Sequence, residues 1–173
     1  EEFPELIAEW DYDKNGMEGT FPSEITRGSH KTVWWKCSKG HLWKAPVYDR
    51  TAGRGCPYCS GRKVLIGYND LASKAPWLLG EWDYEKNSGI SPETVTCGCN
   101  RKVWWKCREG HNWQAAVCAR YGGSGCPYCS GQKVWAGYND FASRYPALAE
   151  EWDYAKNEGM TPSMVTHKSN RKV

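Results

Sequence analysis

Residues 33–63 read VWWKCSKGHLWKAPVYDRTAGRGCPYCSGRK, and residues 103–133 read VWWKCREGHNWQAAVCARYGGSGCPYCSGQK. In each stretch three cysteines and one histidine follow the spacing C-x3-H-x14-C-x2-C, and the second stretch contains one more cysteine, Cys118, outside this pattern. Three thiolates and one imidazole complete the tetrahedral shell of a structural zinc ion. The candidate ligands are Cys37, His41, Cys56 and Cys59, followed by Cys107, His111, Cys126 and Cys129. The repeated spacing predicts two zinc ions per chain.

Disulfide bonds are the alternative use for so many cysteines. The chain has nine Cys, an odd number, each set of ligands includes a histidine, and no segment resembles a secretion signal. Disulfides therefore explain the pattern less well than zinc does. We expect a reducing, intracellular location, either cytoplasmic (nucleoid-associated) or otherwise intracellular, and no secretion. No apolar run is long enough to suggest a membrane span.

The repeat extends beyond the zinc ligands into the pattern P-x-L-x-x-EWDY-x-KN, which occurs at 4–15, 76–87 and 146–157. A proline suits the first position of a helix, and the Leu and Trp four residues apart share one helical face. We therefore predict three short amphipathic helices. Each is expected to end in a left-handed cap at its asparagine, which is Asn15, Asn87 or Asn157.

The segments GYNDLASKAP (67–76) and GYNDFASRYP (137–146) precede two of these helices. Asn69 and Asn139 are the expected N-caps of a further helical turn. The predicted fold is a small, zinc-stabilised α+β fold, a tandem of treble-clef-like fingers in which a β-hairpin with zinc knuckles is joined to short helices. The predicted domains are zinc repeat 1 (1–75), zinc repeat 2 (76–145) and a partial third repeat without zinc ligands (146–173), whose helix is expected to cover the second unit.

Strand alternation sorts the hairpin residues by face. Trp35 and Trp43 fall on the side of the metal and are predicted core residues. Trp34, Lys36 and Lys44 fall on the opposite face, where an aromatic ring flanked by lysines suits base stacking and phosphate contacts. Burial of Trp34 and its counterpart Trp104 under a neighbouring helix is the alternative.

Charge is segregated along the chain. Residues 27–63 contain nine Lys or Arg and one acidic residue, and residues 97–133 contain six and one, whereas the segments before and between them are acidic. Basic patches on rigid hairpins attract polyanions. Simple solvation of a small domain is the alternative, although it predicts interspersed acidic residues. The candidate nucleic-acid contacts are Trp34, Lys36, Lys44, Arg50, Arg54, Arg62, Lys63, Trp104, Lys106, Arg120 and Lys133. Whether the arginines would contact bases or phosphates stays open.

Three further cysteines, Cys97, Cys99 and Cys118, occur only in the second copy and lack a fourth partner, so we expect free thiols. The recurring Glu and Asp of EWDY have no histidine or nucleophile beside them in sequence. We therefore expect no catalytic residues in this chain, and any catalysis would lie elsewhere.

Taken together, WWKC-x2-GH-x-W, G-x-GCPYC, G-x-ND[LF] and P-x-L-x-x-EWDY-x-KN resemble the treble-clef, or probable zinc-ribbon, tandem repeats of bacterial, viral and some plant proteins, which sometimes lie beside nuclease-like domains. The resemblance covers nearly the whole chain. It implies that the eight Cys and His residues named above bind zinc, and that the protein binds nucleic acid.

The expected function is a zinc-dependent nucleic-acid-binding module, with DNA favoured over RNA. The chain starts without Met and stops at Val173, where a third VWWKC would begin. We therefore expect it to belong to a longer protein, whose remaining domains are further partners. The alternative function is a protein-interaction module that uses Trp-rich and acidic helical faces. Two features depart from the repeat pattern, namely the incomplete third copy and the cysteines at 97 and 99.

Overall fold

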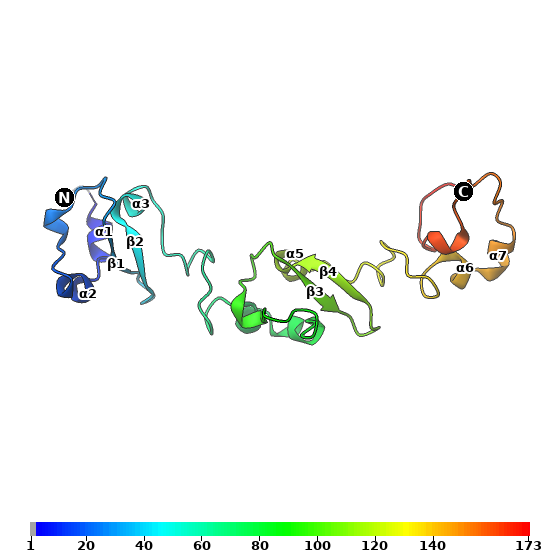
Figure 1. The fold of residues 1–173 in the computed structure, drawn as a ribbon, viewed down its shortest axis with the longest axis horizontal. Coiled ribbons are helices and arrows are strands. Elements are labelled where there is room, and N and C mark those ends of the chain that lie inside the picture. Colours follow the sequence, from blue (N-terminus) through cyan, green and yellow to red (C-terminus); the bar gives the residue numbers. More distant parts are fainter. Residues whose placement is uncertain (1–2) are drawn as a thin grey trace.

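The computed structural model describes residues 3–173 as three lobes that follow one another along the chain (Figure 1). Residues 1 and 2 of the predicted first repeat lie outside the described residues. The first lobe contains α1 (Pro4–Ala8), α2 (Tyr12–Met17), the 3-10 turn η1 (Pro22–Glu24), β1 (Thr32–Lys36), β2 (Leu42–Pro46) and α3 (Val47–Thr51). The second contains α4 (Leu71–Lys74), η2 (Pro76–Glu81), η3 (Pro92–Thr94), β3 (Lys102–Lys106), β4 (Asn112–Ala116) and α5 (Val117–Tyr121). The third contains α6 (Phe141–Arg144), α7 (Pro146–Glu150) and η4 (Pro162–Met164).

Each of the first two lobes is built on one antiparallel hairpin. β1 pairs with β2 so that Trp35 lies opposite Trp43, and β3 pairs with β4 in the same register. Along β1 the buried residues are Val33 and Trp35, while Trp34 is half-buried and Lys36 is exposed. This is the predicted alternation. The predicted α+β class, with two zinc hairpins in tandem, is confirmed.

The EWDY segment packs its tryptophan against the hairpin. Trp10 meets Trp35 edge to face with ring centroids 5.4 Å apart, and Trp82 meets Trp105 in the same way at 5.3 Å. Edge-to-face pairs bring the positive rim of one ring to the negative face of the other, so they add to the stabilisation from burial. These tryptophan pairs lie in two separate hydrophobic cores, one in each of the first two lobes as described from residue 3 onward.

The prediction of one helix ending at each EWDY-x-KN asparagine is wrong. No residue other than glycine has a positive φ among residues 3–173, so no asparagine forms a left-handed cap. The helix of the first lobe ends before Trp10, where the chain runs extended beside β1, and a second helix then starts with Asp11 as its N-cap. Asn15 lies inside this second helix and is fully buried.

The buried asparagine pairs with the backbone of the hairpin. Asn15 Nδ2 donates to the Trp34 carbonyl at 2.8 Å, and its Oδ1 accepts from the Trp34 N–H at 2.8 Å. Asn87 makes the same two bonds to Trp104. The side-chain amide thus makes the two hydrogen bonds to Trp34 that the backbone of a neighbouring strand would make. Asn157 has no hairpin to pair with, and its Nδ2 bonds the Asp153 carbonyl instead.

The connector between the lobes also differs from prediction. Asp70 and Asp140, rather than the preceding asparagines, cap α4 and α6. Leu71 and Ala75 belong to the second core, although the predicted division at residue 75 placed them in the first repeat. The core therefore joins α4 to the hairpin that follows it.

The third lobe has no hairpin, and its helix does not cover the second unit as predicted. α7 contacts α6 instead, and Leu148 on α7 is 50% exposed. Trp152 packs against Phe141 of α6, with ring centroids 6.0 Å apart. Without a Trp35 equivalent, the Trp152 indole N–H donates to the Met160 carbonyl at 3.1 Å. The third lobe therefore keeps the packing of α6 with α7 and η4 that α4 makes with η2 and η3 in the second lobe, but it has no hairpin beside it.

Candidate zinc centres and nucleic-acid interface

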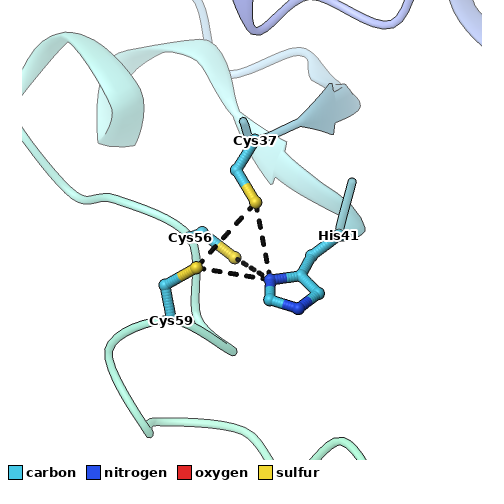
Figure 2. A group of neighbouring side chains, drawn as sticks. All are labelled: Cys37, His41, Cys56 and Cys59. Atoms are coloured by element: carbon cyan, nitrogen blue, oxygen red, sulfur yellow. Dashed lines mark hydrogen bonds between the residues drawn. The ribbon is translucent and has the colours of Figure 1, made fainter. Parts of the chain in front are cut away.

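The four predicted ligands of the first unit converge on one point (Figure 2). Cys37 lies just past β1 and His41 just before β2, while Cys56 and Cys59 come from the CPYC turn that follows α3. His41 Nδ1 lies 3.4, 3.6 and 3.3 Å from the sulfurs of Cys37, Cys56 and Cys59. The Cys37 and Cys59 sulfurs are 3.9 Å apart.

The second unit repeats these distances. His111 Nδ1 lies 3.4, 3.7 and 3.3 Å from the sulfurs of Cys107, Cys126 and Cys129. A tetrahedral zinc ion with Zn–S near 2.3 Å and Zn–N near 2.0–2.1 Å requires S···N edges of about 3.5 Å and S···S edges of about 3.8 Å. The donor types and the distances therefore fit one zinc ion per unit. Each site has four protein ligands, which makes it a closed, structural site.

The surroundings of the ligand thiols determine which of them must lose a proton when zinc binds. Burial alone would raise the pKa of Cys37, but the backbone N–H groups of Lys39 and His41 point at its sulfur and lower it. Burial raises the pKa of Cys56 to about 11, and that of Cys129 to about 12. These two thiols would carry protons at neutral pH without a cation, so zinc binding must release protons.

A shell of residues that sequence reasoning missed supports each histidine. Tyr68 packs edge to face on His41 with ring centroids 4.3 Å apart, and Tyr138 does the same to His111 at 4.4 Å. These contacts fix the ring that carries the ligand nitrogen. The repeated G-Y-N-D motif is the sequence signal for this contact, although its residues by themselves predict only the start of a helix.

The asparagine of the same motif ties down the CPYC turn. Asn69 Nδ2 donates to the carbonyls of Tyr58 and Lys63 at 2.8 and 2.9 Å, and its Oδ1 accepts from the Leu65 N–H at 2.7 Å. Asn139 makes the corresponding bonds in the second unit. The residue predicted as an N-cap is thus a clamp on the zinc knuckle, which explains why it precedes the helix without capping it.

Four of the predicted nucleic-acid contacts line one groove of the first unit. Lys44 on β2 and Arg54, Arg62 and Lys63 around the CPYC turn surround a space of about 300 Å³. All four side chains are exposed. The acidic residue that lines the groove, Asp49, accepts from Arg54 at 3.0 Å. The groove therefore has four cations, of which Arg54 and Lys44 are ion-paired, with Asp49 and Glu18, and it keeps a net positive charge.

Two predicted contacts are wrong, because Arg50 and Arg120 are buried with only 6% of each residue exposed. Arg50 forms an ion pair with Glu9, and Arg120 forms one with Glu81 at 2.5 Å. Each guanidinium also bonds a carbonyl in the loop after its helix and lies over the two core tryptophans of its hairpin. These arginines join the EWDY segment to the hairpin and are not available to a phosphate.

The outer tryptophans, Trp34 and Trp104, are half-buried. They are therefore neither fully exposed for base stacking nor fully covered by a neighbouring helix. Trp34 is contacted by the ammonium groups of Lys14 and Lys44, which lie 4.9 and 5.0 Å from the ring centroid. Its indole N–H donates to Glu18, which also forms an ion pair with Lys44 at 3.0 Å. Trp104 has one such contact, from Lys86 at 4.8 Å. A base stacked on Trp34 would have to displace these lysines.

The remaining predicted contacts, Lys36, Lys106 and Lys133, are exposed. The second unit lacks most of the basic groove, because it has Gln114, Ser124 and Gln132 where the first unit has Lys44, Arg54 and Arg62. Of the four groove positions, only Lys133 keeps its charge. The two units therefore share a zinc site but differ in the surface beside it.

The extra cysteines form no third metal site among residues 3–173. Cys118 Sγ donates to Asn100 Oδ1 at 3.1 Å, and the Arg101 N–H donates to Cys99 Sγ at 3.4 Å. None of the nine cysteines forms a disulfide bond in the described part of the chain. Burial raises the pKa of Cys97, which keeps that thiol protonated.

A hairpin and a CPYC turn that together supply a Cys₃His shell define a tandem treble-clef zinc-finger protein. The family model described as "Probable Treble clef zinc finger domain" matches residues 6–62 and 78–132, which together exceed half of the chain. The chain belongs to this family, as the resemblance implied.

One relative is described as a "Putative endonuclease" of Escherichia phage T5. It is 26% identical over 101 residues, which cover 58% of this chain and 32% of the relative. The chain thus spans about a third of that protein's length. Separately, none of the helices described in residues 3–173 has the length and apolarity needed to cross a bilayer.

Proposed function

We propose that this chain is a zinc-dependent nucleic-acid-binding module that favours DNA over RNA. The observation that carries the proposal is the groove of Lys44, Arg54, Arg62 and Lys63, which lies beside the CPYC turn that supplies two zinc ligands. Phosphate contacts by Lys and Arg provide most of the affinity in such interfaces. The phage relative described as a "Putative endonuclease" adds support, because endonucleases act on nucleic acid.

The proposal gives the chain binding and no catalysis. Both zinc sites are closed by four protein ligands, so neither offers a position for an activated water. The EWDY carboxylates Glu9 and Glu81 form ion pairs with buried arginines, and Asp11 and Asp83 accept from the backbone N–H three residues on. In the first two units these groups therefore have structural partners.

The test is binding of fluorescein-labelled duplex DNA, single-stranded DNA and duplex RNA to the zinc-loaded protein, followed by anisotropy across a salt series. We expect binding at low salt that weakens steeply as salt rises, with a log–log slope of about −3 to −4 if the four groove cations contact phosphates. Tighter binding to DNA than to RNA is expected. No binding to any of the three at low salt would overturn the proposal.

A protein-interaction module is the second candidate, and an exposed aromatic pair favours it. Trp77 on η2 is 66% exposed and stacks on Tyr121, which is 47% exposed, with ring centroids 6.4 Å apart. Exposed aromatic side chains are typical of interfaces. Trp77→Ala would leave DNA affinity unchanged if this pair serves a protein partner, and would lower it if the pair stacks on bases.

A further inference from the structure

The first unit has an apolar cleft that none of residues 3–173 fills. It encloses about 300 Å³ and is lined chiefly by Leu6, Ile7, Trp10, Ile25 and Trp35. It lies between the EWDY segment, the η1 turn and the hairpin, on the core of the unit rather than at the zinc site. No part of the basic groove contributes to it.

The same place in the second unit is filled by α4. Leu71 is completely buried, and it belongs to the core that contains Leu78 and Val95, the counterparts of Leu6 and Ile25. Leu78 and Val95 are 4% and 5% exposed, whereas Leu6 and Ile25 are only half-buried. The second unit thus has a preceding helical turn from which Leu71 and Ala75 join its core, and the described residues of the first unit include no such turn.

The backbone around the cleft shows the same difference. The Leu71 N–H donates to the Val95 carbonyl at 2.8 Å, and the Phe141 N–H donates to the Val165 carbonyl at 2.9 Å in the third lobe. Each contact continues as a one-residue bridge, Asp70 with Thr96 and Asp140 with Thr166. The equivalent carbonyl in the first unit, on Ile25, accepts no hydrogen bond from residues 3–173.

We propose that the cleft of the first unit binds a short helical turn of the type Asp-Leu-Ala-Ser or Asp-Phe-Ala-Ser, seated as α4 and α6 are seated in the other two lobes. The leucine or phenylalanine fills the apolar space, its N–H bonds the Ile25 carbonyl, and the aspartate caps its own turn as Asp70 does. The two turns of this type in residues 3–173, α4 and α6, are already seated in the other two lobes, so neither of them is the segment that fills the cleft. A second copy of the chain is a poor donor, because its own Leu71 is buried and its own Phe141 N–H is already bonded.

The repeat fixes the design of the test. Phe3 aligns with Ala75, so adding Gly-Tyr-Asn-Asp-Leu-Ala in front of Glu1 places the added leucine in the register of Leu71. The matched control carries the same extension with aspartate in place of that leucine. Both are compared with the unextended, zinc-loaded 173-residue protein by hydrogen–deuterium exchange and by thermal unfolding.

We expect the leucine extension to slow exchange in peptides covering residues 3–10 and 20–27 by about tenfold or more, and to protect the amide of the added leucine. Peptides of the second unit serve as an internal reference and should not change. The first unit should also unfold at a higher temperature with leucine and not with aspartate. Equal exchange in the two extended proteins would overturn the proposal, and so would protection of the unextended protein that rises with its concentration.

Discussion

Asn15 and Asn157 occupy the same position of the repeat and have different environments. Asn15 is buried and bonds both backbone groups of Trp34, whereas Asn157 is half-buried and bonds one carbonyl of its own turn. A polar side chain that satisfies two buried backbone groups is costly to remove, because its partners are left without water and without a bond.

We therefore expect Asn15→Ala to lower the free energy of unfolding by about 2–4 kcal/mol. Asn157→Ala is the matched control and should change it by less than about 0.5 kcal/mol. Both values are measured by urea denaturation of the zinc-loaded protein, monitored by near-ultraviolet circular dichroism. Similar losses for the two variants would show that the backbone pairing to Trp34 contributes little.

At the scale of the elements, the zinc hairpin was predictable and the helices were not. Metal coordination fixes the residue types and the spacing of ligands, so Cys37 and His41 could be identified from sequence. The helix boundaries depend on pairing with β1, a contact between segments about twenty residues apart. Local propensity could not reveal that Asn15 would pair with a strand rather than end a helix.

Arg50 shows that the candidate site, too, depends on contacts between residues that are distant in sequence. In sequence it belongs to the same basic run as Arg54, and its partner Glu9 lies 41 residues away. A signal was nevertheless present. The arginines that bind the EWDY glutamate are identical in both units, whereas Arg54 and Arg62 become serine and glutamine. Comparison of the internal repeats separates Arg50 from the variable Arg54 and Arg62, although it does not separate it from exposed lysines such as Lys36 and Lys63, which are also identical in both units.

Removing zinc should unfold the hairpins. The metal joins β1, β2 and the CPYC turn, and each core is small, so the apo units lose the cross-link on which their packing depends. We expect two zinc ions per chain, one after Cys56→Ser, and loss of the near-ultraviolet signal of the buried tryptophans on chelation. A protein that retains this signal after complete zinc removal would contradict the prediction.

The same sites should respond to acid. The ligand thiols bind zinc as thiolates, and protons compete with the metal for sulfur, so zinc affinity falls as pH falls. Burial raises the pKa of metal-free Cys56 to about 11, which strengthens this competition throughout the neutral range. Zinc release to a chromophoric chelator should therefore increase as the pH is lowered from 8 to 5. Release that is independent of pH would contradict thiolate ligation.

For the whole molecule, the three lobes share one sequence repeat but have three different surfaces. The first unit carries the basic groove and the open apolar cleft, the second carries the exposed aromatic pair, and the third lacks a zinc site among its described residues. This separation predicts that nucleic-acid affinity depends on the first unit more than on the second.

Exchanging residues between the units tests this directly. Arg54→Ser with Arg62→Gln gives the first unit the residues of the second, and should weaken DNA binding and flatten the salt slope by about 1–2. Ser124→Arg with Gln132→Arg is the reciprocal change and should strengthen binding. Anisotropy titrations measure both, and thermal unfolding checks that each variant is folded. Equal affinities for all proteins would exclude the groove as the contact surface.

The pairing of the EWDY segment with β1 has a further consequence for self-association. A two-stranded hairpin normally leaves backbone groups free along its outer edges, and near-identical hairpins in tandem could zip together through them. Here the outward-facing groups of Trp34 bond Asn15 and the Asp11 N–H, and the Lys36 N–H bonds the Glu9 carbonyl at 2.7 Å. On the opposite strand Lys44 and Pro46 discourage pairing by charge and by the absence of an N–H. The outer edge of β1, and that of β3 at Trp104, is therefore closed to a neighbouring strand. Copies of this sheet-forming motif can share a chain without joining through that edge.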